Sequence, residues 1–177
     1  MSTALANCSL PQTSIIPVEP ATYTRPISGD EVIIDATDGS VAIYGSIELF
    51  KGGIYNYSSV TLGVQGQARG LVKVAVHEQV KNANFAQIFG NLDQSFFTEH
   101  QVVKFVQTYR NWPRTGGHAK FIPFMVGDEK LVAVVHFDVC GELTMDVRCF
   151  SSASVWDVDA RRCFVVLEME PSVPCVP

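Results

Sequence analysis

The spacing of apolar residues in the first half of the chain predicts β-structure. From residue 31 to residue 80, apolar and polar positions tend to alternate, which is typical of half-buried strands. The pair Asp38-Gly39 is a strong signal for a type I′ hairpin turn, because both central residues of that turn need positive φ. We expect four or five strands in this half. The predicted runs are residues 32–34, 41–49, 54–62 and 71–77.

The clearest helix signal begins at Thr98. Thr98 stands three residues before Gln101, and this spacing predicts a capping box, in which each side chain satisfies a free backbone N–H of the other residue. Glu99 in the first turn and Arg110 in the last turn would suit the helix dipole. Pro113 ends the helix, because the residue before a proline avoids the α region. One apolar face at helical spacing is formed by Val102, Phe105, Val106 and Tyr109.

After this helix the spacing of apolar residues returns to two, which predicts a four-stranded antiparallel meander. Pro123 places the first strand at an edge or a bulge of the sheet. Residues 143–149 alternate so regularly that one of their faces is expected to contact solvent. The fold class is therefore α+β, with a β-rich N-terminal half and then an amphipathic helix packed on a C-terminal antiparallel β-meander. The predicted meander strands are residues 119–126, 131–137, 143–149 and 163–169.

Prolines mark both ends of the chain. Residues 1–30 contain four prolines and little periodicity, so we interpret them as an extended arm. Residues 171–177 form a similar tail. Between them we expect a β-rich half, residues 31–80, and a second half of helix plus meander, residues 81–170. Residues 31–170 also fit a single domain.

Composition and charge restrict the partners. The 177 residues are 47% hydrophobic and 18% charged, against roughly 25% charged in a typical soluble domain. Either the core is large or apolar surface meets a partner, which favours a homo-oligomer or a complex with another protein. The net charge of −5 disfavours nucleic acid as the main partner. No basic residue precedes Arg25 and no apolar run could span a bilayer, so we expect a cytoplasmic protein without membrane contact.

The loop after the predicted helix is a weak candidate for anion binding. A glycine-rich turn with basic residues can hold a phosphate or a carboxylate, because glycine lets backbone N–H groups approach an anion. The loop follows a helix C-terminus, however, and it matches no P-loop spacing. A solvated connection is therefore the favoured interpretation. The candidate residues are Arg110, Arg114, Gly116, Gly117, His118 and Lys120.

Histidines, cysteines and aromatic residues suggest few other sites. Five widely spaced cysteines argue against a disulfide scaffold, and no two histidines have metal-ligand spacing. His136 and Cys149 lie on adjacent predicted strands and form the one pair worth testing for proximity.

A stacking surface of aromatic side chains is a further candidate, although aromatic residues beside strands more often fill a core. We predict no catalytic residue, metal or cofactor. The aromatic candidates are Tyr55, Tyr57, Trp112 and Trp156.

Part of the chain resembles a known family. Residues 98–105 (TEHQVVKF), 110–114 (RNWPR) and 117–124 (GHAKFIPF) resemble a family of short, uncharacterised bacterial proteins, as do positions near Val155-Trp156 and residues 161–166. The resemblance covers roughly residues 83–170. It implies the helix-and-meander fold and a bacterial origin, and it transfers no activity and no catalytic residue.

These observations together favour a non-enzymatic binding or assembly module of bacterial or phage origin. The absence of catalytic motifs, the low charge and the proline-rich ends support this interpretation. One alternative is a small enzyme with its site near residues 110–120 or at His136 and Cys149. Another is a structural particle subunit whose N-terminal arm binds a neighbouring subunit.

Overall fold

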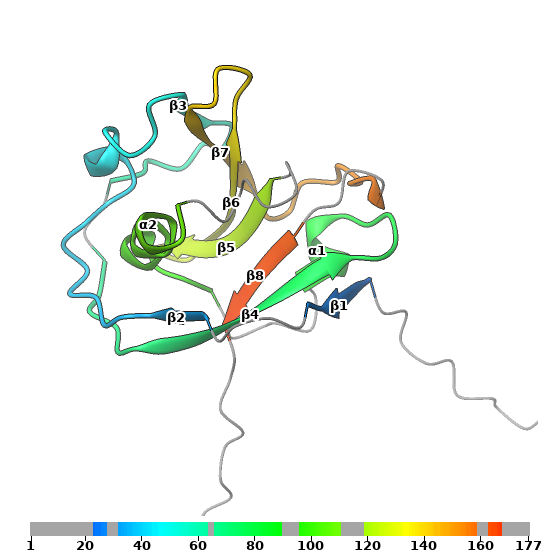
Figure 1. Ribbon diagram of the computed structural model, residues 1–177, viewed down its shortest axis with the longest axis horizontal. Helices are drawn as coiled ribbons and strands as arrows, with labels where there is room; N and C mark the ends of the chain where they lie inside the picture. Colours follow the sequence, from blue (N-terminus) through cyan, green and yellow to red (C-terminus); the bar gives the residue numbers. More distant parts are fainter. Residues whose placement is uncertain are drawn as a thin grey trace, which may run out of the picture.

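The computed structural model describes residues 23–27, 32–63, 66–89, 96–110 and 119–158, and the backbone of residues 163–167. These residues form an α+β fold, as the sequence predicted (Figure 1). The described elements are β1 (Thr24–Pro26), β2 (Val32–Ile34), the 3₁₀ helix η1 (Tyr44–Ser46), β3 (Gly53–Asn56), β4 (Val72–Gln79), α1 (Phe85–Phe89), α2 (Glu99–Thr108), β5 (Lys120–Val126), β6 (Glu129–Phe137), β7 (Leu143–Cys149) and β8 (Cys163–Leu167).

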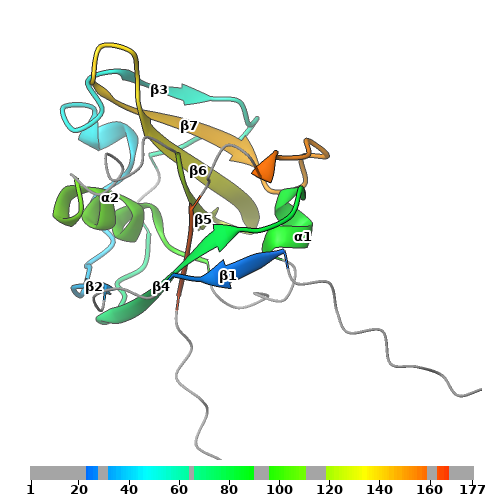
Figure 2. The ribbon, with the colours of Figure 1, turned by 45° about the vertical axis from the view of Figure 1, so that its right-hand side comes forward.

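The strands form a mixed sheet in the order β1-β4-β8-β5-β6-β7-β3, and β2 also pairs with β4. Strands β5, β6 and β7 are the predicted antiparallel meander (Figure 2). The prediction that the fourth strand continues this meander is wrong. Strand β8 crosses to the other side of β5, pairs with it in parallel and joins it to β4. The N-terminal strands therefore flank the C-terminal meander on both sides.

Helices α1 and α2 pack against opposite faces of the central strands. Side chains alternate across a strand, so Ile122 faces the core under α2 while its neighbour Phe121 faces the core under α1. The core under α2 combines both halves of the chain. It includes Ile34, Ile43, Phe50, Leu62 and Val74 from the first half, and Val102, Phe105, Ile122, Ala133 and Met145 from the second.

The N-terminus of α2 has the predicted capping box. The Gln101 N–H donates to Thr98 Oγ1 at 3.2 Å, and the Thr98 N–H donates to Gln101 Oε1 at 3.0 Å. The helix ends at Thr108, so Arg110 follows the helix and does not lie in its last turn as predicted. Pro113 lies outside the described residues.

The strand predicted over residues 41–49 does not form. The segment is irregular and contains η1, although Ile43 is fully buried. Gly39 has the positive φ that the sequence predicted, at 79°, but no hairpin follows. Its carbonyl instead accepts the Gly66 N–H at 3.0 Å. Alternation in this segment was therefore a misleading signal, because local turn bonds from the Ser46 and Leu49 N–H groups to the Ile43 and Ser46 carbonyls take the place of a ladder.

Two other predicted segments also differ from the structure. The strand predicted over residues 54–62 ends at Asn56, whose side chain accepts the Ser58 N–H and donates to the Val60 carbonyl. Such local bonds favour a turn over a ladder. Within the predicted arm, Thr24–Pro26 forms β1, while the residues before Tyr23 lie outside the described part.

Pro123 lies where β5 loses its strand neighbour. Strand β8 pairs with β5 at Lys120 and Phe121. Beyond them, the Pro123 carbonyl accepts the Phe97 N–H at 3.0 Å on the side away from β6. Because the N–H and C=O of one residue face the same neighbour, the missing proline donor falls on this side and weakens no bond to β6. This agrees with the predicted edge position.

Replacing Thr98 by alanine tests the cap. Thr98→Ala removes the acceptor for the Gln101 N–H and should lower the free energy of unfolding by about 1 kcal/mol. Urea unfolding followed by circular dichroism measures this. Thr108→Ala, at the other end of α2, is the matched control and should change stability by less than about 0.5 kcal/mol. Equal effects of the two substitutions would contradict the role of the cap.

The Asp38 carboxylate, in the segment between β2 and η1, should make the stability of the protein depend on pH. The pKa of Asp38 is lowered, chiefly by the hydrogen bond from the Ser40 hydroxyl and then by that from the Ser40 N–H. The ionised Asp38 carboxylate therefore contributes its full stabilisation above the pKa of the unfolded state. That stabilisation is lost as the pH falls through the lower pKa of the folded state. The difference in urea midpoint between wild type and Asp38→Asn should shrink as the pH falls from about 6 to about 3.

The Ser40→Ala variant tests the same hydrogen bond from its donor side. It removes the main cause of the lowered pKa of Asp38, so the difference in urea midpoint between this variant and wild type should also shrink as the pH falls from about 6 to about 3. If both differences stayed constant, the assigned hydrogen bonds would not stabilise the Asp38 carboxylate.

Candidate functional site

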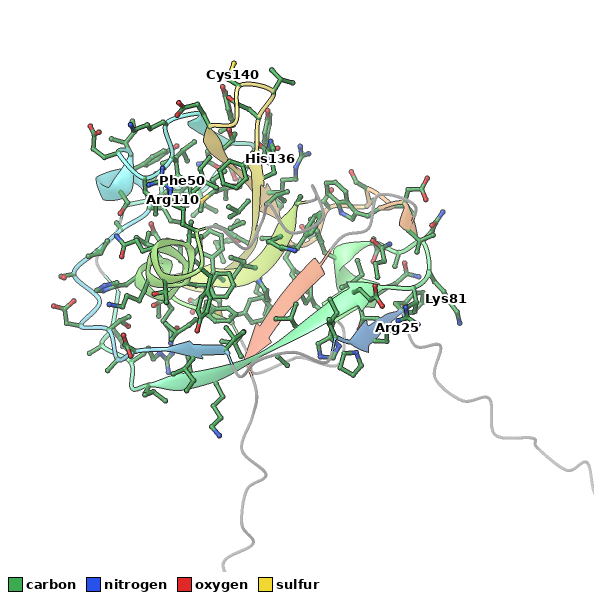
Figure 3. The ribbon with its side chains drawn as sticks, in the orientation of Figure 1. Arg25, Phe50, Lys81, Arg110, His136 and Cys140 are labelled. Atoms are coloured by element: carbon green, nitrogen blue, oxygen red, sulfur yellow. The ribbon has the colours of Figure 1, made fainter. Side chains whose placement is uncertain are left out.

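The structure describes two residues of the predicted anion loop. Arg110, which is labelled in Figure 3, is exposed just beyond α2. Lys120 is 3% exposed at the start of β5. The structure does not bear on anion binding by this loop, which stays a prediction. The other candidates lie outside the described residues, namely Arg114, Gly116, Gly117 and His118.

His136 and Cys149 do not form a site together. His136 pairs with Thr144 in the β6–β7 ladder, and Cys149 pairs with Leu131. Five residues along β6 separate Leu131 from His136, a distance of about 16 Å. Residues five apart on a strand also point to opposite faces. The two side chains therefore cannot act as nucleophile and base.

A different group of side chains gathers on the sheet face opposite α2. We call Tyr55, Tyr57, Asp146, Arg148 and Trp156 the tyrosine–arginine surface. Tyr55 lies beside Asp146 in the parallel β3–β7 ladder. The Tyr57 N–H donates to the Val147 carbonyl at 2.8 Å, which places Tyr57 next to Arg148. The pairing of β3 with β7 therefore brings residues almost a hundred positions apart into one row.

Arg148 is the centre of the tyrosine–arginine surface. Its guanidinium carbon lies 4.7 Å from the ring centroid of Tyr57 and 5.5 Å from that of Trp156. Both distances suit cation–π attraction. Its Nη2 also donates to Asp146 Oδ2 at 3.2 Å. One planar cation is thus held between two rings and one carboxylate.

Burial and charge define what this surface can do. The side chains of Asp146 and Arg148 are 17% and 34% exposed, so the face that the sequence predicted to be solvated is half-covered. Tyr55 and Tyr57 are 50% and 60% exposed. The charges of Arg148 and Asp146 balance each other, so the most exposed side chains of this surface are the two neutral tyrosines, Tyr55 and Tyr57. Tyrosine, tryptophan and arginine together are typical of protein recognition surfaces.

The sequence pointed to some of these residues. Tyr55 and Tyr57 are exposed as the stacking hypothesis required, whereas Trp156 packs against Phe85 and Phe121 in the core under α1. Trp112 lies outside the described residues. Sequence reasoning missed Arg148, because its partners come from β3 and from the connection after β7.

Within the described ranges, no group of three or more His, Cys, Asp or Glu residues is placed to hold a metal ion. The described helices include none with both the length and the apolar character needed to cross a membrane. Comparisons with protein-family models, with curated proteins and with solved structures find no match. The resemblance to short bacterial proteins over residues 83–170 therefore stays a prediction.

A double-mutant cycle tests the ion pair at the centre of the surface. Arg148→Met leaves Asp146 half-buried without its partner, and Asp146→Asn removes the charge that Arg148 balances. Each single substitution should lower the free energy of unfolding by about 1–2 kcal/mol. The double variant should lose about 0.5–1 kcal/mol less than the sum of the two, as measured by urea unfolding. Strict additivity would show that the two side chains do not stabilise each other.

Proposed function

We propose that this protein is a non-enzymatic assembly module that pairs with a second copy of itself along β3. A cytoplasmic location and a bacterial or phage origin belong to this proposal as expectations from the sequence. An enzyme with its site near residues 110–120 stays a prediction that no contact of the described residues favours.

The observation that carries the proposal is the exposure of two tyrosines at an edge strand. Among the described strands, β3 pairs only with β7 and so ends the sheet. Tyr55 lies on β3 and Tyr57 directly follows it, and at least half of each is exposed. An unpaired edge presents backbone donors and acceptors to another chain. Exposed tyrosines beside such an edge supply the large contact area on which many interfaces depend.

The arrangement of β3 suits a second copy in particular. The Tyr57 N–H bonds toward β7, so the backbone groups of its neighbour Asn56 face outward. If two copies of β3 met antiparallel about Asn56, each Tyr55 would lie opposite the partner's Tyr57. Such a twofold contact is self-complementary. Cross-strand aromatic pairs stabilise a sheet by roughly 0.2–1 kcal/mol each.

Charge does not oppose this contact. Arg148 is balanced by Asp146 in the same copy, so the tyrosine–arginine surface of one copy brings no uncompensated charge toward the other. A composition that is 47% hydrophobic and 18% charged also suits a chain that buries more surface on assembly. The alternative, a structural particle subunit, also needs a contact between copies of the chain. It assigns that contact to the N-terminal arm and not to β3.

Light scattering coupled to size-exclusion chromatography tests the proposal. The wild-type protein should elute as a dimer whose fraction rises with protein concentration. The double variant Tyr55→Ser with Tyr57→Ser should raise the dimer Kd at least about tenfold, because each tyrosine acts twice in a twofold interface. Circular dichroism should show that the double variant keeps its fold.

Leu71→Ser is the matched control. Leu71 is 58% exposed beside β4, on the opposite side of the sheet from β3. Its replacement removes exposed apolar surface without touching β3, so the dimer should remain. A wild-type protein that is monomeric at every concentration would remove the assembly proposal. A dimer unaffected by the tyrosine substitutions would place the contact away from β3.

A further inference from the structure

A pocket of about 420 Å³ lies at the N-terminus of α2, on the far side of the meander from β3. Its volume falls within the range of small-molecule sites, roughly 300–1,000 Å³. Three separate segments surround it, so the tertiary fold creates it. Its lining residues are Gly66, Gln67 and Arg69, then Phe96 to Glu99, then Met125, Val126 and Gly127.

Part of the pocket lining is polar and cationic. Gln67 and Arg69, two positions apart in the chain, both belong to it. Both are exposed, and within the described ranges neither side chain has a hydrogen bond or an ion pair. The Arg69 backbone is fixed by two hydrogen bonds with Thr37, at 2.8 and 2.9 Å. Arg69 thus has a fixed backbone and a guanidinium that bonds to no side chain or carbonyl among the described residues.

The rest of the lining includes apolar side chains. Phe96, Met125 and Val126 contribute a ring, a thioether and a branched side chain, all partly exposed. The ammonium of Lys130 lies 5.0 Å from the Phe96 ring centroid, which adds positive charge beside this ring. A lining that combines a guanidinium with apolar side chains suits a ligand that carries both an anionic group and an apolar group.

The helix N-terminus does not itself provide the anion site. Thr98 caps the Gln101 N–H, and the Glu99 carboxylate is turned toward the N–H groups of Ile43 and Gly63. Glu99 is 4% exposed, so its carboxylate is buried and is occupied by these two N–H groups. The group available to bind an external anion is therefore Arg69.

We propose that this pocket binds a small organic carboxylate that carries an apolar or aromatic group. The carboxylate lies against Arg69 and Gln67, where the planar guanidinium can donate two parallel hydrogen bonds. The apolar group lies against Phe96, Met125 and Val126. This site shares no residue with the β3 edge, so ligand binding and self-association are independent.

Titration with phenylacetate, followed by amide chemical shifts in ¹⁵N-labelled protein, tests the proposal. Saturable shifts are expected in the three segments that line the pocket. Benzyl alcohol and 2-phenylethylamine, which keep the ring and lack the carboxylate, should bind at least about tenfold more weakly, because neither can make the charged hydrogen bonds between a carboxylate and Arg69. Equal binding of the three probes would overturn the assignment of a carboxylate.

Substitutions at Arg69 locate the charge. Arg69→Gln should weaken phenylacetate binding at least about tenfold, and Arg69→Lys should weaken it less, because the charge remains while the paired hydrogen bonds are lost. Arg25→Gln is the matched control. Arg25 is exposed on β1 and pairs with Glu78 at the far edge of the sheet, so its loss should leave binding unchanged (Figure 3). No saturable shift with phenylacetate, or equal binding by wild type and Arg69→Gln, would overturn the proposal.

Discussion

The buried carboxylate of Glu99 joins the two halves of this protein. It accepts the Ile43 N–H at 2.8 Å and the Gly63 N–H at 3.2 Å, and the residue is 4% exposed. An ionised carboxylate taken out of water costs several kcal/mol unless hydrogen bonds replace its hydration. Both loops must therefore hold their N–H groups in place whenever α2 is packed on the sheet. This requirement couples the path of residues 43–63 to the position of the helix.

Other side chains of α2 extend the same coupling. The Nδ1 of His100 accepts the Gly39 N–H at 3.2 Å, and the Tyr109 hydroxyl bonds both the N–H and the carbonyl of Ile33 at 3.0 Å. One helix thus satisfies backbone groups along much of the first half of the chain. Within residues 41–49, the Ile43 N–H bonds to the helix, whereas the Ser46 and Leu49 N–H groups bond inside the segment to the Ile43 and Ser46 carbonyls. These donors are therefore satisfied without a strand ladder.

The two proposed surfaces follow from this arrangement. Residues 66–69 approach the N-terminus of α2 and leave a pocket whose lining includes Arg69, Phe96 and Met125. The chain before them pairs β3 with β7 at the end of the sheet, where Tyr55 and Tyr57 stay exposed and Arg148 is held between rings. The first surface suits a small ligand, and the second suits another protein chain.

Several features depend only on neighbours within a few residues, and these could be predicted from the amino-acid sequence. These include the Thr98–Gln101 cap, the meander β5–β7 and the position of Pro123. The tertiary structure decided the crossing of β8, the irregular path of residues 41–49 and the union of Tyr57 with Arg148. Capping and side-chain alternation are local, so they can be read along the chain. Strand order and burial depend on which distant groups satisfy each backbone N–H. The spacing of apolar residues along the chain does not predict those partners.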